Sequence, residues 1–332
     1  MNFQINKQDK IQRIDNALES LHKHYEHCTL CPRECGINRQ KSEFGFCETG
    51  SQVSISQAVL HYGEEPVLSG YFNCKTGRPK RYGSGTLFFS GCNLKCLFCQ
   101  NYQISWEMQG KPLSAPELSD KMLLLQQKGA LNINLVSPNH VLLPILEALR
   151  IAYTKDLHIP LVYNTNGYDK AEIIKLLDGI VDIYLPDMKY FSSETAVRYS
   201  RAPEYFLHTS SSITEMYYQQ PALALGDTET AESGMIIRHL ILPGQSEDSI
   251  QILKWIANNL STRVALSLMS QYHPCFKAPQ EIQRNISILE YKSVLNSAYE
   301  LGFETMYIQP EPFQEEEHRM PDFKKKDPFD WD

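Results

Sequence analysis

Short apolar segments alternate with longer amphipathic ones from about residue 84 onward. Runs typical of strands occur at 86–90, 133–136, 161–165, 182–186, 235–242 and 264–269, with a weaker one at 305–309. Helical spacing predicts helices between them, at about 114–128, 140–155, 169–178, 192–219 (interrupted), 246–259 and 281–301. Strands that alternate with helices form parallel sheets with right-handed crossovers. The pattern therefore predicts an α/β protein, with either an open doubly wound sheet or a barrel.

The first 83 residues follow a different pattern. Ile11, Ile14, Leu18 and Leu21 recur at helical spacing and predict a helix over 7–26. Residues 28–80 have no such rhythm and are rich in glycine, cysteine and charge, so we expect a loop-dominated appendage that a bound metal would stabilise. The expected organisation is an N-terminal helix and cysteine-rich metal-binding segment (1–83), a catalytic core (84–310) and a polar C-terminal tail (311–332) with a solvated Lys run at 324–326.

Composition narrows the function classes. The chain has 332 residues, enough for one catalytic domain and a small appendage, with 42% apolar and 21% charged residues. Its net charge of -7 offers no general attraction for phosphates, so we expect no nucleic-acid partner. The N-terminus lacks a signal-like apolar stretch, and no run of about 18 apolar residues occurs. We expect a cytoplasmic protein without membrane contacts.

Seven of the nine cysteines fall into two tight clusters, and such clusters in a reducing compartment hold metal more often than they form disulfides. Cys92, Cys96 and Cys99 directly follow the first predicted strand of the core. Iron–sulfur clusters usually take four protein thiolates, so three leave one metal position open to bind and activate a reactant. A zinc site completed by a distant residue, or buried thiols without metal, remain alternatives.

The C-x-x-x-C-x-x-C spacing, with Phe98 before the third cysteine, resembles the radical S-adenosylmethionine (SAM) superfamily. The phrase GTLFFSGCNLKCLFCQN resembles its pyruvate formate-lyase activating branch, and the resemblance extends over about residues 84 to 275. It implies a partial (β/α)6 barrel whose three cysteines hold a 4Fe-4S cluster. It also implies reductive cleavage of SAM to a 5′-deoxyadenosyl radical that abstracts hydrogen from a substrate.

Later segments match the activating-enzyme pattern in order. They are YNTNG at 163–167, where Asn164 replaces the usual Asp of D-T-N-G, PDMK at 186–189, RHLILPG at 238–244 and YH at 272–273. The family's G-G-E motif is absent, and Asn139 could accept the methionyl ammonium hydrogen bond without the charge of a carboxylate. The residues implied to contact the cofactor are Phe98, Asn139, Thr165, Asn166, Asp187, Lys189, Arg238 and His273.

The first cluster contains Cys28, Cys31, Cys35 and Cys47. Four thiols close a tetrahedral site, which favours structural zinc or a fully ligated iron–sulfur cluster, while unbound thiols or a disulfide remain alternatives. The segment resembles the C-x-L-C-P-R-x-C-G-x-N-R leader of PflX-like proteins, a group related to the pyruvate formate-lyase activating enzyme. Two further cysteines, Cys74 and Cys275, are expected to be lone thiols, although Cys275 could face the active site.

The leading functional hypothesis is a radical SAM enzyme, an oxidoreductase resembling glycyl-radical activating enzymes, that acts on a protein or peptide. The resemblance also implies an electron donor such as flavodoxin or ferredoxin. This hypothesis predicts a wide lateral groove lined by Tyr272, His273 and the loop after Asp187. The alternatives are a radical SAM enzyme acting on a small metabolite, and a non-catalytic iron–sulfur or zinc binding module.

Overall fold

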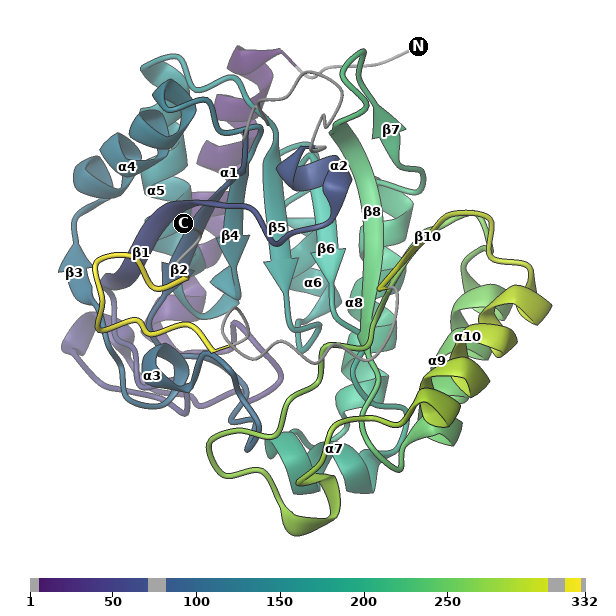
Figure 1. The fold of residues 1–332 in the computed structure, drawn as a ribbon. Coiled ribbons are helices and arrows are strands. Elements are labelled where there is room, and N and C mark those ends of the chain that lie inside the picture. Colours follow the sequence, from purple (N-terminus) through teal and green to yellow (C-terminus); the bar gives the residue numbers. More distant parts are fainter. Residues whose placement is uncertain (1–5, 71–81, 310–319, 330–332) are drawn as a thin grey trace.

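The protein is organised around one ten-stranded, mostly parallel sheet, seen here in a computed structural model that describes residues 6–70, 82–309 and 320–329 (Figure 1). The adjacent parallel strands are β2 (Ser84–Phe89), β4 (Ile133–Val136), β5 (Leu161–Thr165), β6 (Ile183–Pro186), β8 (Ala231–Leu240), β9 (Ala265–Met269) and β10 (Met306–Ile308). The antiparallel strands are β1 (Val53–His61) on β2, β3 (Lys111–Leu113) on β1, and β7 (Ala224–Leu225) on β8. The predicted α/β fold is confirmed.

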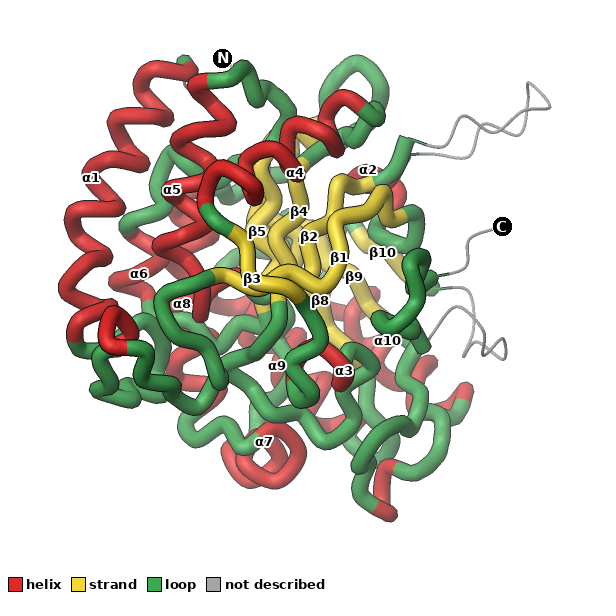
Figure 2. The backbone as a smooth tube through the Cα atoms, turned by 90° about the vertical axis from the view of Figure 1, so that its left-hand side faces the viewer, coloured by secondary structure: helices red, strands yellow, loops and turns green. Residues whose placement is uncertain are grey.

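Most of the helices pack on the outer face of this sheet, as Figure 2 shows for α1, α5 and α6. The longer ones are α1 (Lys7–Glu26), α4 (Ala115–Gln127), α5 (Leu142–Thr154), α7 (Ser193–Ser200), α8 (Tyr205–Gln219), α9 (Ser246–Asn259) and α10 (Ile288–Leu301). The shorter ones are α2 (Pro66–Ser69), α3 (Tyr102–Ser105) and α6 (Ala171–Lys175), with 3-10 turns at Arg39–Lys41, Pro138–Val141 and Gln280–Ile282. None of the helices in the described ranges is both long and apolar enough to span a bilayer.

Local sequence explains where several helices begin. Ser114 and Ser287 each accept a hydrogen bond from the third residue of the following helix, and the Glu at that position reaches back, which makes a capping box at α4 and at α10. The first helix is anchored to the barrel by Lys10, whose ammonium contacts Asp182 at 2.6 Å just before β6. The leader helix therefore packs as part of the core and not as a separate arm.

The sheet curves into a partial barrel with two free edges. Strands β3 and β10 end the sheet, and no pairing joins them within the described parts of the chain. The inner face is partly filled by α2, whose Val67 and Leu68 pack against inward-facing apolar residues of β5 and β6. The loops gather at the carboxyl ends of the parallel strands, at the lower end of Figure 1.

Residues 320–329 lie against the inner face of the sheet near β2 (Figure 1). The rings of Phe323 and Phe329 are each 5.3 Å from that of Phe88, centroid to centroid, and both side chains are buried. This part of the expected polar tail is therefore packed by two aromatic side chains, whereas Lys324, Lys325 and Lys326 between them are exposed as expected.

The stretch 28–80, which was expected to consist mainly of loops, contributes the nine-residue strand β1 to the barrel sheet. Pairing with β2 along six registered positions provides the partner that a lone strand would lack. The domain boundaries remain a prediction. Cys74 lies outside the described residues.

Candidate active site

Cys92, Cys96 and Cys99 lie in the loop that follows β2, at the carboxyl edge of the parallel sheet. Active sites of α/β folds are built from such loops. Gly91 opens the loop with a φ of +86°, where a Cβ would lie only 2.6 Å from the carbonyl oxygen of Cys47. Glycine is therefore required both by the backbone conformation and by the close approach of the leader.

Each of the three sulfurs has a polar neighbour. Asn166 Nδ2 donates to Cys92 Sγ at 3.4 Å, and Ser200 Oγ donates to Cys96 Sγ at 2.9 Å. Cys99 Sγ and Ser105 Oγ are 3.2 Å apart. Hydrogen bonds to sulfur are one means by which proteins adjust the potential of an iron–sulfur cluster.

Burial makes these thiols difficult to ionise on their own. Burial, and to a smaller extent the neighbouring Cys96 sulfur, raises the pKa of Cys92 to about 11 and that of Cys99 to about 12. Burial likewise raises the pKa of Cys96. Three thiolates would repel one another unless a positively charged core lay between them, and metal binding would then release the protons. The donor set therefore fits a thiolate-bound cluster.

Asp187, Lys189 and Arg238 meet where β6 and β8 end. Lys189 Nζ lies 2.5 Å from an Asp187 oxygen. The backbones of Asp187 and Arg238 form an isolated parallel β-bridge. Burial alone would lower the pKa of Lys189, but the charges of Asp187 and Cys96 raise it overall, so its ammonium stays charged close to the cysteine loop. The structure brings together three of the predicted residues here.

The partners of Arg238 are Glu64 and Glu65, which lie in the N-terminal segment 1–83 and were not predicted. Arg238 Nε and Nη2 donate to the two oxygens of Glu65 at 2.8 and 2.6 Å, and Nη2 also donates to Glu64. Although burial would raise the pKa of Glu65, the charge of Arg238 lowers it. An arginine within an apolar strand needs a partner for its charge. Nothing in the sequence indicated which of the acidic residues it was.

Asn139 and Thr165 converge on a buried carboxyl group that the sequence did not single out. Asp169 accepts from Asn139 Nδ2, from Thr165 Oγ1 at 2.5 Å and from Tyr163 Oη at 3.2 Å. Burial raises the pKa of Asp169, and these donors lower it in part. The Asn139 Oδ1 atom is buried and has no hydrogen-bond partner within the described residues. An unpaired acceptor at this position fits the ammonium group that the resemblance assigns to Asn139.

The loop after β9 packs onto the cysteine loop. The Phe98 and Tyr272 rings are 5.5 Å apart, and Cys275 Sγ donates to the Phe98 carbonyl at 3.3 Å. His273 is half-buried, and its Nδ1 has no hydrogen-bond partner among the residues that the structure describes. Tyr272 is buried and donates to the Ile282 carbonyl, so its side chain does not line an open groove.

Sequence comparison matches residues 86–210 to the radical SAM superfamily, over the segment that contains the three cysteines and Asp187. The chain therefore contains a radical SAM superfamily domain. Membership implies a 4Fe-4S cluster and SAM as cofactors, and the donors described above fit both groups.

Two archaeal proteins resemble this radical SAM protein along most of its length. MJ0674 of Methanocaldococcus jannaschii is 31% identical over 320 residues, which cover 92% of this chain and 85% of that protein. MJ0808 of the same organism is 23% identical over 312 residues, which cover 90% and 86% respectively.

Two solved structures show a weak similarity to this chain. The Streptococcus suis SuiB structure, bound to its precursor peptide SuiA, aligns with a TM-score of 0.43 and 10% identity over 65% of this chain and 46% of SuiB. Methylornithine synthase (PylB) aligns with a TM-score of 0.43 and 14% identity over 90% of this chain and 74% of that chain. Neither similarity is high enough to bear on the substrate.

The leader cysteines form a second group of neighbouring thiols beside the radical SAM core. Cys28, Cys31 and Cys47 are buried and Cys35 is partly buried, and all four are free thiols. Burial, together with the nearby Cys47, Cys28 and Cys35 sulfurs, raises the pKa of Cys31 to about 12. As the side chains stand, no three His, Cys, Asp or Glu residues in the described ranges converge on the position of a single metal ion.

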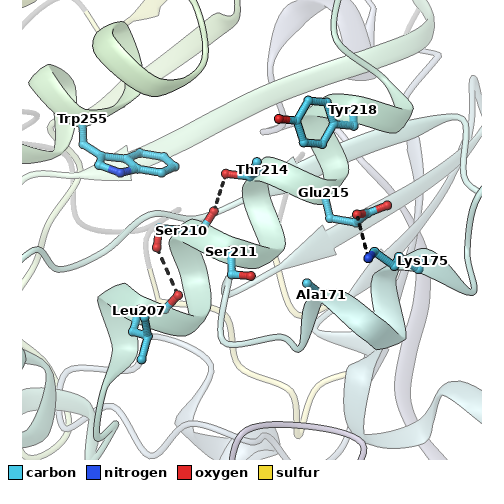
Figure 3. A pocket seen from close by; sticks show the side chains of 9 residues that line it. All are labelled: Ala171, Lys175, Leu207, Ser210, Ser211, Thr214, Glu215, Tyr218 and Trp255. Atoms are coloured by element: carbon cyan, nitrogen blue, oxygen red, sulfur yellow. Dashed lines mark hydrogen bonds and ion pairs between the residues drawn. The ribbon is translucent and has the colours of Figure 1, made fainter.

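An open groove on the outer surface contributes nothing to this site (Figure 3). Its polar contacts are those of ordinary helix surfaces, such as Thr214 Oγ1 donating to the Ser210 carbonyl and Lys175 facing Glu215 at 4.0 Å. The residues that line it come from α6, α8 and α9: Ala171, Lys175, Leu207, Ser210, Ser211, Thr214, Glu215, Tyr218 and Trp255.

Proposed function

We propose that this radical SAM enzyme abstracts a hydrogen atom from a protein or peptide, in the manner of glycyl-radical activating enzymes. The observation that carries the proposal is the cysteine loop with its phrase GTLFFSGCNLKCLFCQN, which resembles the activating branch. The edges β3 and β10 of the partial barrel, which have no further strand partner in the described parts of the chain, are compatible with a polypeptide approaching from the side. The same resemblance makes a flavodoxin or a ferredoxin the proposed electron donor.

In this proposal the protein holds and orients the reacting groups. When bound, the 4Fe-4S cluster and SAM supply the 5′-deoxyadenosyl radical. Cys92, Cys96 and Cys99 would hold the cluster, while Asn166 and Ser200 fix the sulfurs that they contact. The unpaired Oδ1 of Asn139 would accept the ammonium of the methionyl moiety.

The charged groups around Arg238 would have a different role. Lys189 and Arg238 are partly buried cations held by carboxylates, so their positions are fixed before any ligand arrives. We propose that they orient the cofactor at the carboxyl ends of β6 and β8. The Phe98 ring, braced by Tyr272, and His273 complete the proposed wall on the β9 side. A second metal, zinc or iron–sulfur, is proposed at the leader cysteines.

A small metabolite is the second candidate substrate, and specific observations favour it. The helix α2 and residues 320–329 both cover the inner face of the sheet, which limits the space for a polypeptide. Tyr272, expected beside an open groove, is buried.

Hydrogen transfer distinguishes the two substrate classes. The reconstituted and dithionite-reduced enzyme would be incubated with SAM and with either the macromolecular or the small-molecule fraction of a deuterated cell extract. Deuterium in 5′-deoxyadenosine from the macromolecular fraction is the expected result, and the Cys96→Ala variant serves as the inactive control. Transfer from the small-molecule fraction alone would replace the protein substrate by a metabolite. A reduced, cluster-loaded enzyme that never releases 5′-deoxyadenosine would support the non-catalytic module.

A further inference from the structure

A buried arginine in the leader has no carboxylate partner among the described residues. Arg39 is 2% exposed, and its polar contacts are two sulfurs, one hydroxyl and two carbonyls. No Asp or Glu among the described residues forms an ion pair with it. A guanidinium removed from water without an anion is strongly unfavourable, so the structure has to supply negative charge from another group.

The sulfurs occupy the positions where a carboxylate would normally be found. Arg39 Nε donates to Cys28 Sγ and Nη2 donates to Cys47 Sγ, both at 3.1 Å. Nε and Nη2 form the edge of the guanidinium that binds carboxylates in a two-pronged manner. The remaining Nη1 donates to the Thr49 hydroxyl and to the Gly50 and His140 carbonyls. These bonds hold the guanidinium so that its Nε–Nη2 edge faces the two cysteine sulfurs.

Neutral thiols cannot supply the negative charge that the buried Arg39 needs. A thiol is a weak acceptor without net charge, and a disulfide would be equally neutral. Thiolates bound to metal are good acceptors and remain ionised at neutral pH. A divalent zinc ion, or a cluster core of the same charge, would leave a net charge of about -2 when it takes four thiolates. Arg39 would neutralise part of that charge.

The other two cysteines are held close to this pair by the leader backbone. The Cys28 amide donates to the Ile37 carbonyl and the Gly36 amide donates to the Cys28 carbonyl, which places Cys28 beside the turn after Cys35. The Phe46 amide donates to Cys35 Sγ at 3.4 Å, one residue before Cys47. A rotation of these side chains would be needed for all four sulfurs to reach one metal centre, because they do not converge on a single-ion position as they stand.

We propose that Cys28, Cys31, Cys35 and Cys47 bind one thiophilic metal centre as thiolates, and that Arg39 is its built-in counter-ion. This inference deepens the second metal of the proposed function and assigns a charge to the site. It also explains why the arginine is buried. The centre lies against the catalytic loop, because the carbonyl of Cys47 is the group that excludes a side chain at Gly91.

Metal content is best measured where the catalytic cysteines cannot contribute. In a Cys92→Ala/Cys96→Ala/Cys99→Ala variant, purified aerobically or reconstituted anaerobically with iron and sulfide, the leader should retain about one zinc or about four iron with sulfide per chain. Either ion supports the proposal, and the ratio identifies which one is used. A folded triple variant that takes up neither would overturn it, without affecting the radical chemistry at the other cysteines.

The role of Arg39 is tested by competition with a chelator in the same background. Arg39→Gln should lower the affinity for the metal by about tenfold to a hundredfold, the usual effect of removing a group that supports metal ligands. Arg39→Lys should recover only part of it, because an ammonium cannot serve both sulfurs side by side. Arg13→Gln, which removes an exposed guanidinium from α1, is the matched control and should change nothing.

A purely structural role for Arg39 gives a different result. The Arg39→Gln variant would then unfold more easily with or without metal, and the chelator would remove metal from it as slowly as from the parent. Thermal unfolding before and after removal of the metal separates the two cases even if Arg39→Gln folds poorly, because Arg39→Lys keeps the buried charge. Equal metal affinity in all three arginine variants would overturn the proposal.

Discussion

The Asn166 amide donates to Cys92 Sγ at 3.4 Å, so a residue from the end of β5 reaches the first cysteine of the loop after β2. The same amide donates to Asn93 Oδ1 at 2.8 Å, and the Asn166 Oδ1 accepts from the Tyr168 amide. These three contacts fix the orientation of the Asn166 side chain. The cysteine loop and the NTNG turn are thereby coupled by side-chain hydrogen bonds.

Removing this contact should change the potential of the cluster more than its assembly. In Asn166→Leu the three thiols remain, but Cys92 loses a hydrogen bond that favours the reduced, more negative cluster. We expect the midpoint potential to fall by roughly 40 mV, since a hydrogen bond contributes about 1 kcal/mol and 59 mV corresponds to about 1.4 kcal/mol for one electron. A redox titration followed by electron paramagnetic resonance measures it. Asn259→Leu, on α9, is the control, and an unchanged potential in Asn166→Leu would contradict the assignment.

The Glu65–Arg238 pair should be important for stability. Glu65 is 7% exposed and meets Arg238 through two contacts, so Glu65→Gln removes the carboxylate that makes both contacts with this partly buried guanidinium. We expect a loss of about 3 kcal/mol in the free energy of unfolding, at the lower end for breaking a buried ion pair. Urea denaturation of the apoprotein measures this. Glu34→Gln removes the exposed partner of Lys170 and should cost under about 1 kcal/mol. A similar small loss in both variants would show that the buried pair is unimportant.

The helices and strands of the core could be predicted because each carries its own periodicity. The predicted helices 7–26 and 246–259 and the strands 133–136 and 161–165 match the observed bounds of α1, α9, β4 and β5. Burial on one face determines these patterns locally, without information from the rest of the chain.

Contacts between distant segments could not be predicted in this way. Glu65, the partner of Arg238, lies 173 residues earlier in a stretch without periodicity. Asp169 follows the NTNG turn, and its burial depends on Asn139 from another strand end. Strand β1 was missed because its alternating start, V-S-I-S, is followed by half-buried positions that only pairing with β2 stabilises.

Lowering the pH should destabilise the folded protein, because His239 resists protonation in the folded state. Its Nδ1–H donates to the Met188 carbonyl at 2.6 Å, and burial lowers its pKa to about 4 from 6.5. Because the unfolded chain binds a proton between these two values and the folded chain does not, this contribution is complete above pH 6.5 and is lost as the pH falls toward 4. The loss amounts to about 3 kcal/mol at 1.36 kcal/mol per pKa unit.

The variant His239→Asn retains a donor but cannot titrate. Urea denaturation at several pH values should show a flatter dependence for this variant than for the parent, while exposed His158→Gln should follow the parent. Parallel curves for His239→Asn and the parent would exclude His239 as the titrating group.

Asp169 should influence SAM binding through Asn139. As a carboxylate it accepts from Asn139 Nδ2 and so leaves Oδ1 as the free acceptor. In Asp169→Asn the two amides no longer have a fixed orientation, and we expect about a tenfold loss of SAM affinity, or about 1.4 kcal/mol. Calorimetry with the oxidised, cluster-loaded protein measures it without turnover. Tyr163→Phe removes only the third donor to Asp169 and should bind SAM normally. If both variants bind like the parent, Asn139 is not oriented by Asp169.

The segment 320–329 should detach from the barrel when its aromatic anchors are removed. Phe323 and Phe329 pack on Phe88, and the Phe323 amide donates to Gln103 Oε1 at 2.6 Å. In a Phe323→Ala/Phe329→Ala variant most of the apolar contact is lost, each ring being worth about 3 kcal/mol or more when buried in a core. We expect a protease to cleave the chain near Lys324, Lys325 and Lys326 at least tenfold faster, with little change in the urea midpoint, because the segment can open without unfolding the sheet. Phe44→Ala, which removes an exposed ring from the leader, is the control.

If this segment limits access to the inner face, the variant should also release 5′-deoxyadenosine faster in the absence of substrate, since water and reductant would reach the site more easily. Unchanged proteolysis would mean that contacts other than the two phenylalanines hold the segment in place.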